Sequence, residues 1–163
     1  SATVLEDSVN DTVRATVGPT SGRWYWEVTL EVSSGGSYNG ICVADADLWL
    51  EVSPGCSYPG LHYKRQGSLC ADSSYLDPGD SYGEGAVVGV AIDADLSLGW
   101  VHVDGVWQGA GGPGDGPGFA LGIPAGEAVY PCINISQGDL YTANFGQQPF
   151  AHAVPDGFHA GVD

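Results

Sequence analysis

The most regular pattern along the chain is an alternation of apolar and polar residues over positions 23–31. Successive side chains of a β-strand point to opposite faces, so this alternation predicts a strand with one buried face. The residues between the apolar positions are expected to point away from the core, which makes the strand half-buried. The apolar face would carry Trp24, Trp26, Val28 and Leu30.

Further strands are predicted where short apolar runs end at turn residues. The run at 86–92 is too continuously apolar for a solvent-facing strand and predicts a central one. Asp104 and Gly105 form the two-residue loop of a type I′ hairpin, because both residue types tolerate a positive φ. The other predicted strands cover 38–44, 61–65, 68–71, 98–103, 106–108, 128–135 and 139–145.

Three segments lack a strand pattern. Residues 72–85 are polar, and residues 109–118 consist of Gly, Pro, Ala and Asp, so both predict surface loops. The tail over 147–163 is interrupted by proline. We expect its Phe150 and Phe158 to pack over an open end of the sheets.

The composition agrees with strands and tight turns. Of 163 residues, 26 are Gly and 10 are Pro, a density at which few helices persist. Hydrophobic residues make up 43% of the chain, which is enough for a buried core in one domain of this length. We therefore predict an all-β domain with almost no helix.

The charge balance restricts the class of partner. Asp and Glu number 20 against 4 Lys and Arg, which gives a formal net charge of −16 at pH 7. Such a field repels phosphate backbones and anionic lipid head groups, so nucleic acid and membrane surfaces are not expected partners. No apolar run reaches the roughly 18 residues of a membrane span, so no spanning segment is expected.

Five separated segments, taken in order, resemble the SPRY domain, particularly its bacterial and viral branch. The likeness covers most of the chain, and its specificity comes from the order of the five signatures. The resemblance implies a bent, jelly-roll-like sandwich of two antiparallel sheets whose loops at one end bind proteins, with no catalytic role. The segments are 21–28 (SGRWYWEV), 88–93 (VGVAID), 100–107 (WVHVDGVW), 130–132 (YPC) and 143–150 (ANFGQQPF).

The beginning of the chain departs from that family pattern. The branch commonly has an additional strand before the segment that matches 13–17, but only about a dozen residues precede it here. We therefore divide the chain into an N-terminal strand and tether over 1–11 and a sandwich domain over 12–163. The strand either pairs within its own domain or is donated to a neighbouring subunit, and head-to-tail donation would propagate as a filament. Its residues are Ala2, Thr3, Val4 and Leu5.

Cysteine usage favours disulfides over free buried thiols. The four cysteines form an even set, and none lies in a C-x-x-C or His-flanked spacing typical of zinc sites. Four cysteines allow three pairings, and the spacing alone does not select one. We expect Cys42 with Cys132, which would link two apolar strands, and Cys56 with Cys70, which would close a surface loop.

Two asparagines are candidate glycosylation sites. Asn10 and Asn134 each begin an N-x-[ST] acceptor pattern. Together with the expected disulfides, this pattern favours an extracellular location on a secreted, cell-surface or virion protein.

Aromatic residues gather in the loop-rich region 45–85, which the SPRY resemblance places toward the binding loops. Exposed Trp and Tyr carry much of the contact energy at interfaces and stack on sugar rings. These residues either contact a partner or cover the ends of the sandwich. The candidates are Trp49, Tyr58, Tyr63, Tyr75 and Tyr82.

No pattern predicts a catalytic centre, a bound metal or a cofactor. The D-x-D pairs at 45–47 and 93–95 offer oxygen ligands but lack the remaining spacing of a calcium loop, and Asp is common at strand turns. Four histidines have no i, i+4 spacing and are expected on strand or tail surfaces. They are His62, His102, His152 and His159.

The sequence therefore favours a non-enzymatic, extracellular structural protein that associates with itself through its N-terminal strand into a filament or a surface or virion structure. The alternative is an adhesin-like module of a phage or bacterial surface that binds a protein or a glycan through the aromatic loops. No cofactor is expected in either case.

Overall fold

The computed structural model of the chain describes residues 2–4, 11–35, 39–47, 56–76 and 79–162. These ranges form strands and contain no helix that could cross a membrane. The strands are β1 (Ala2–Val4), β2 (Asp11–Arg14), β3 (Arg23–Val32), β4 (Gly40–Ala44), β5 (Gly60–Lys64), β6 (Leu69–Ala71), β7 (Ser74–Leu76), β8 (Val87–Asp93), β9 (Leu98–Val103), β10 (Val106–Trp107), β11 (Phe119–Ala120), β12 (Tyr130–Ile135), β13 (Leu140–Asn144) and β14 (His159–Ala160).

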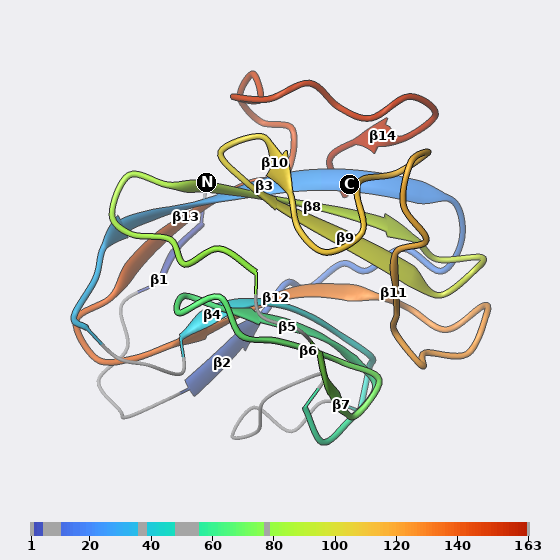
Figure 1. Ribbon diagram of the computed structural model, residues 1–163, viewed down its shortest axis with the longest axis horizontal. Coiled ribbons are helices and arrows are strands. Elements are labelled where there is room, and N and C mark those ends of the chain that lie inside the picture. The colour runs from blue at the N-terminus through green and yellow to red at the C-terminus, as the bar shows by residue number, and fades with distance from the viewer. Residues whose placement is uncertain (1, 5–10, 36–38, 48–55, 77–78, 163) are drawn as a thin grey trace.

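The strands form two sheets that pack face to face. Sheet A has the order β1-β13-β3-β8-β9-β10, with β11 beside β9 and β14 beside β3, and sheet B has the order β2-β12-β4-β5-β6-β7. Figure 1 shows sheet A as the upper layer and sheet B as the lower one. Among the described strands only β14 pairs in parallel, with β3. The predicted all-β sandwich of two antiparallel sheets is therefore confirmed.

The inner faces of the two sheets supply one core. Trp26, Val28 and Leu30 of β3 are buried, as the alternation predicts. Ile41 of β4 and Ile133 of β12 occupy one register position of sheet B and belong to the same buried cluster. Because removal of apolar surface from water is the main favourable term in folding, this shared core holds the two layers together.

The opposite face of β3 is also covered, which the alternation does not predict. Tyr25 and Glu27 are buried because the C-terminal tail crosses the outer face of sheet A (Figure 1). Phe150 packs edge-on against Tyr25 and Phe158 against Trp100, with ring centroids 5.2 and 6.1 Å apart. The tail therefore covers a face of sheet A. The expectation that it would pack over an open end of the sheets is wrong.

The hairpin between β9 and β10 has the predicted turn. Asp104 and Gly105 both have a positive φ, of 48° and 85°, and Val103 pairs with Val106 on either side of them. The carboxylate of Asp104 also accepts the N–H of Val87 at 2.8 Å. This bond fixes the hairpin to the start of β8.

The N-terminal strand pairs within its own chain. Residues 2–4 lie antiparallel to 141–143 of β13 at the edge of sheet A, and β2 pairs with β12 at the edge of sheet B. Of the two alternatives for this strand, the structure has the one in which it completes its own domain. Leu5 of the candidate strand lies outside the described residues.

Candidate functional site

The five aromatic candidates separate into buried and exposed residues. Tyr63 and Tyr82 are buried, and their rings stack with centroids 5.7 Å apart. They fill the core and are therefore wrong as binding residues. Trp49 lies outside the described residues. Tyr58 and Tyr75 are exposed, and 71% of the surface of Tyr75 is accessible.

Tyr75 belongs to β7, where sheet B ends in the described part of the chain. All three residues of β7 are exposed. The Nζ atom of Lys64 lies 5.4 Å from the centroid of the Tyr75 ring. An edge strand is a place where a strand from another chain can pair. The sequence did not predict β7, because residues 72–85 read as a polar loop.

A groove runs between β7 and the loop that follows β10, and we name it the edge groove. Its volume is about 1460 Å³, open space included. Sheet B contributes one wall and sheet A the other. The residues that line it include Leu76, Asp80, Trp107, Gln108 and Phe119.

Hydrogen bonds of Gln108 fix the floor of the edge groove. Its Oε1 atom accepts the N–H of Asp80 at 2.7 Å and the hydroxyl of Tyr63 at 3.2 Å. Its Nε2 group donates to the carbonyl of Val106 at 2.8 Å. Because Gln108 is 5% exposed and fully engaged, it joins the sheet A wall to the sheet B wall. Burial, and then the charge of Asp80, raise the pKa of Tyr63, so its hydroxyl stays a neutral donor.

Glycine shapes the sheet A wall. Gly109 has a φ of 73°, and a Cβ atom there would lie 2.6 Å from Cζ of Phe119. The absence of a side chain therefore lets the loop turn beside the Phe119 ring. The sequence analysis selected neither Trp107 nor Phe119 as a binding residue. The signal that could have found them is the glycine-rich run at 109–118 next to an aromatic hairpin.

The cations of the chain are few and already in contact with other groups. Arg14 donates to the carbonyl of Ala46 at 2.7 Å, and Arg23 pairs with Asp93 at 2.8 Å. Lys64 is buried apart from 6% of its surface. With a net charge of −16, the surface presents mainly negative charge to a partner. Asp80 brings that charge to the edge groove.

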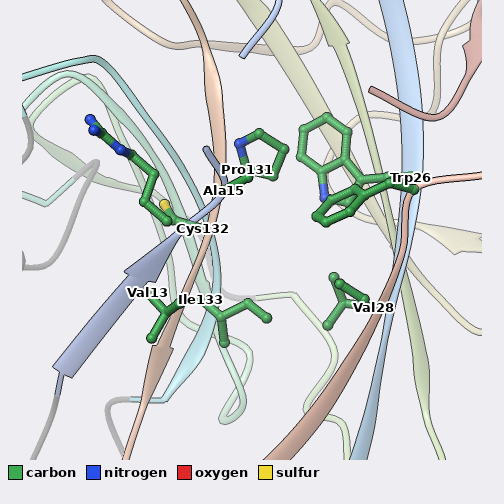
Figure 2. Close-up of a pocket in the computed structure, with 10 residues that line it drawn as sticks. Val13, Ala15, Trp26, Val28, Pro131, Cys132 and Ile133 are labelled. Carbon is green, nitrogen blue, oxygen red and sulfur yellow. The ribbon is translucent and has the colours of Figure 1, made fainter. Parts of the chain in front are cut away.

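A second concavity, the apolar crevice, lies between the sheets on the side of β2 and β13. Its volume is about 430 Å³, open space included. Figure 2 shows Trp26 and Val28 facing Pro131 and Ile133 across it. An apolar lining can accept an apolar group but fixes no orientation by hydrogen bonds. We therefore take the edge groove, which has both apolar walls and polar groups, as the candidate site.

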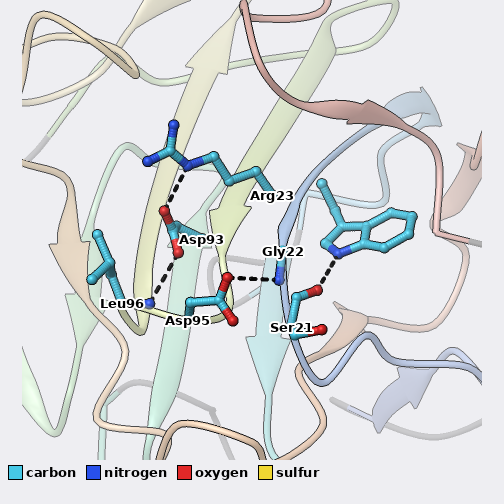
Figure 3. Close-up of polar contacts among 7 residues, drawn as sticks. Ser21, Gly22, Arg23, Asp93, Asp95 and Leu96 are labelled. Carbon is cyan, nitrogen blue, oxygen red and sulfur yellow. Dashed lines mark hydrogen bonds and ion pairs between the residues drawn. The ribbon is translucent and has the colours of Figure 1, made fainter.

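The D-x-D pairs stabilise turns. The carboxylate of Asp93 accepts from Nε of Arg23 at 2.8 Å and from the N–H of Leu96 at 2.9 Å (Figure 3). Asp95 accepts the N–H of Gly22 at 3.0 Å. The other pair closes its own turn through a bond from the N–H of its second residue to the carboxylate of its first. Within the described residues, no group of three or more His, Cys, Asp or Glu side chains could hold a metal ion.

One of the two expected disulfides is present. Cys56 and Cys70 are bonded, with a sequence separation of 14. Cys42 and Cys132 are buried free thiols, so the second pairing is corrected. The two strands that it would link, β4 and β12, are joined by backbone pairing instead.

The glycosylation prediction fails at Asn134. This residue is 3% exposed, and its Nδ2 group donates to Oγ1 of Thr12 at 2.9 Å. A glycan needs an exposed asparagine, so Asn134 cannot carry one in the folded domain. Asn10 lies outside the described residues.

Two of the four histidines are not on the surface. His62 is 0% and His102 is 1% exposed. They belong to β5 and β9, strands that have a neighbour on each side, so the expectation of surface positions is wrong for both. His159 is exposed and His152 is half-buried in the tail.

No protein-family profile matches the sequence. One curated relative is the E3 ubiquitin-protein ligase RKP of Arabidopsis thaliana, which is 31% identical over 154 residues. The match covers 84% of this chain and 10% of the relative, so the chain spans a tenth of that protein's length.

A solved structure gives the wider match. The crystal structure of the SPRY domain of human HERC1 agrees with a TM-score of 0.69 at 17% identity, over 88% of this chain and 87% of that chain. Similarity over most of both chains at 17% identity shows a shared fold. Five ordered sequence signatures, two antiparallel sheets and this superposition lead to one conclusion: the chain has the fold of a SPRY domain.

Proposed function

We propose that this domain is a protein-interaction module that binds an extended, basic segment of a partner protein in the edge groove. The observation that carries the proposal is that the exposed edge strand β7 borders a groove whose lining combines apolar side chains with polar groups. Edge strands recognise peptides by backbone pairing, and pockets beside them select alternate side chains.

The register of sheet B defines what a bound strand would meet. Leu76 pairs with Leu69, which pairs with Tyr63, so Leu76 is on the inner face and borders the groove. A strand added to β7 would direct every second side chain toward the same side. Those side chains would lie between Leu76 and the rings of Trp107 and Phe119.

Charge selects the composition of the bound segment. The domain carries 20 acidic against 4 basic residues, and Asp80 lines the groove. Complementary potential raises the association rate and excludes partners of like charge. A segment that alternates apolar residues with Lys or Arg can pack its apolar side chains in the groove and pair its cations with the negative charge of the domain.

The comparisons support interaction and do not extend to catalysis. Protein–protein interaction is the function that a SPRY fold suggests. The Arabidopsis relative is named a ligase, but the match spans 10% of it, so we do not transfer the activity of the whole enzyme. A non-enzymatic role for this domain accordingly belongs to the proposal.

The test uses the isotope-labelled domain and two acetylated seven-residue peptides, one alternating lysine with leucine and one alternating glutamate with leucine. We expect the lysine peptide to shift the amide resonances of Ser74, Tyr75 and Leu76 and to protect them from hydrogen exchange. We expect the glutamate peptide to bind about tenfold more weakly or not at all.

A matched pair of variants locates the site. Leu76→Lys places a cation in the groove wall and should weaken binding of the lysine peptide about tenfold. Leu96→Lys makes the same change at a residue that is 62% exposed in the turn between β8 and β9, and it should leave the affinity unchanged. Equal losses in both variants, or resonance shifts confined to other faces, would contradict the proposed site.

Self-assembly through the N-terminal strand has weaker support. β1 already pairs with β13 of its own chain, so a filament would require the strand to leave that edge. A single species of monomer mass in light scattering, over a range of concentrations, would argue against it. An extracellular location also stays a proposal, and the Cys56–Cys70 disulfide supports it, because such bonds persist in oxidising compartments.

A further inference from the structure

Three chemically reactive side chains lie in one row on the outer face of sheet B. Cys132 of β12 pairs with Cys42 of β4, and Cys42 pairs with His62 of β5. Directly paired residues of antiparallel strands point to the same face. All three are buried, with 3%, 0% and 0% of their surface exposed. The row is separate from the edge groove, and the proposed peptide binding does not use it.

The two thiols are placed for a bond to each other. Directly opposite residues of antiparallel strands have Cα atoms about 4.5–5.5 Å apart, and a disulfide requires about 4.4–6.8 Å. Cys42 and Cys132 could therefore be bridged without moving β4 against β12. In the structure both remain free thiols.

His62 supplies the second observation. Its Nδ1 and Nε2 atoms are both buried and have no hydrogen-bond partner. Buried polar atoms are almost always bonded, so an imidazole with two free nitrogens calls for a role. Its cross-strand neighbour Cys42 is an acid whose proton such a nitrogen can take.

The electrostatics select which thiol ionises first. Burial on its own raises the pKa of Cys42, but the hydrogen bond from Cys132 and the imidazole of His62 outweigh it and lower the pKa. Burial raises the pKa of Cys132, and the hydrogen bond with Cys42 raises it further. Of the two thiols, Cys42 is therefore the one that loses its proton more readily.

We propose that Cys42 and Cys132 form an oxidation site for small hydroperoxides, with Cys42 as the nucleophile, Cys132 as the resolving thiol and His62 as the proton carrier. The Cys42 thiolate attacks the terminal oxygen of the peroxide, an S–O bond forms and the O–O bond breaks. The departing alkoxide or hydroxide takes the proton held by His62 and leaves as alcohol or water. Cys42 is then a sulfenic acid.

The second step closes the pair. The sulfur of Cys132 attacks the sulfur of Cys42, the S–S bond forms and the S–O bond breaks. The hydroxide that leaves takes the thiol proton of Cys132 and becomes water. Two thiols are oxidised to one disulfide and one peroxide is reduced, so no further co-reactant is needed. Because both thiols are almost fully buried, bulky oxidants and thiol reagents are excluded from the folded domain.

The experiment treats the folded domain with hydrogen peroxide and measures intact mass and disulfide-linked peptides without reduction. We expect the loss of two hydrogen atoms and a Cys42–Cys132 peptide beside the Cys56–Cys70 one. In Cys132→Ala, dimedone should trap a sulfenic acid on Cys42, whereas Cys42→Ala should leave Cys132 unoxidised under the same conditions. A bulky aromatic disulfide reagent should react with neither thiol before unfolding.

Two histidine variants test whether His62 transfers a proton or only supports the fold. His62→Gln should slow peroxide oxidation about tenfold at neutral pH and move the midpoint of the rate–pH profile upward. His159→Gln, at an exposed histidine, should change neither quantity. Stable sulfinic acid without a bridge, no oxidation of the wild-type domain, or equal reactivity of the two single-cysteine variants would overturn the proposal. The wild-type measurement decides it even where a variant fails to fold.

Discussion

Gly89 and His102 face each other across β8 and β9, and a Cβ atom on Gly89 would lie 2.0 Å from Nε2 of His102. The imidazole occupies the space that a side chain at position 89 would need. From there Nε2 donates to the hydroxyl of Tyr25 at 2.7 Å, because Nδ1 accepts the N–H of Gly105 at 3.1 Å. Tyr25 in turn donates to Glu27 at 2.9 Å. The absence of a side chain at Gly89 in a central strand thus makes room for a buried series of hydrogen bonds.

Gly89→Ala should therefore destabilise the domain. The added methyl group forces the His102 ring away from Tyr25, and overpacking of this kind costs about 1–3 kcal/mol. Urea unfolding should show a lower midpoint with an unchanged slope. The control is Gly83→Ala, because a Cβ atom there meets nothing within 4 Å. A Gly89→Ala domain as stable as the Gly83→Ala domain would contradict the packing argument.

The same network should make stability depend on pH. Burial, and then the neighbouring His152, lower the pKa of His102 from 6.5 to about 4, against the opposing charges of Glu27 and Asp104. The unfolded chain therefore binds a proton below pH 6.5 that the folded chain does not bind until pH is near 4. The free energy of unfolding should fall through this window by about 3 kcal/mol from this group alone.

Urea titrations at several pH values between 4 and 7 test this dependence. His102→Gln keeps a donor near Tyr25 but cannot titrate, so its stability should change less over the same window. His152→Gln removes the neighbouring charge without removing His102 and should retain most of the dependence. An identical pH profile for wild type and His102→Gln would show that other groups cause the loss.

The local sequence pattern was sufficient to predict two kinds of element. These are elements that pair with a neighbour close in sequence and strands that place one face in the core. The alternation at 23–31 predicted which side chains of β3 enter the core. The hairpin at Asp104 and Gly105 needed only the φ preferences of two residues. The sandwich class followed from these elements and from the density of glycine and proline.

The outer faces could not be predicted, because their cover comes from distant residues. Tyr25 and Glu27 occupy the polar side of the alternation, but the tail residues Phe150 and Ala151 pack on them or bond to them. Glu27 Oε2 accepts the N–H of Ala151 at 2.8 Å. The pattern of residues 23–31 alone cannot predict that a segment from the C-terminal tail will cover the outer face of β3.

The candidate site shows the same limit for tyrosines of one sheet. Tyr63 and Tyr75 are both in sheet B, but Tyr63 points into the core and Tyr75 points outward from an edge strand. A shift of one residue in strand register exchanges the two faces. Residues 61–64 alternate Leu, His, Tyr and Lys, which places Tyr63 on the same face as Leu61. Residues 72–85 have no strand pattern, so the sequence did not fix the face that Tyr75 would take.

Asp139 should be among the most sensitive acidic residues. It is 0% exposed and accepts the N–H and the hydroxyl of Ser34 at 2.8 and 2.9 Å and the N–H of Ser136 at 3.0 Å. It also accepts the side-chain amide of Asn39. It therefore joins the loop after β3 to the turn between β12 and β13.

Asp139→Ala leaves these donors buried without an acceptor, and we expect a loss of about 3–5 kcal/mol in the free energy of unfolding. Asp139→Asn keeps one acceptor oxygen and should lose less. Asp115→Ala, at an exposed acid in the loop after β10, should change stability by about 0.5 kcal/mol or less. Equal values for Asp139→Ala and Asp115→Ala, measured by urea unfolding, would show that the buried bonds contribute nothing.

The Cys56–Cys70 disulfide should stabilise both the fold and the edge groove. It closes a loop with a sequence separation of 14, which corresponds to about 3 kcal/mol by restriction of the unfolded chain. Cys70 also pairs with Tyr75 across β6 and β7, so the bond anchors the strand on which β7 depends. In the double variant Cys56→Ala and Cys70→Ala, we expect a lower unfolding midpoint and faster hydrogen exchange at Ser74–Leu76 than at the amides of β8. If the variant lost stability while exchange at β7 stayed unchanged relative to β8, the bond would act only on the unfolded chain, and its support of the groove would be refuted.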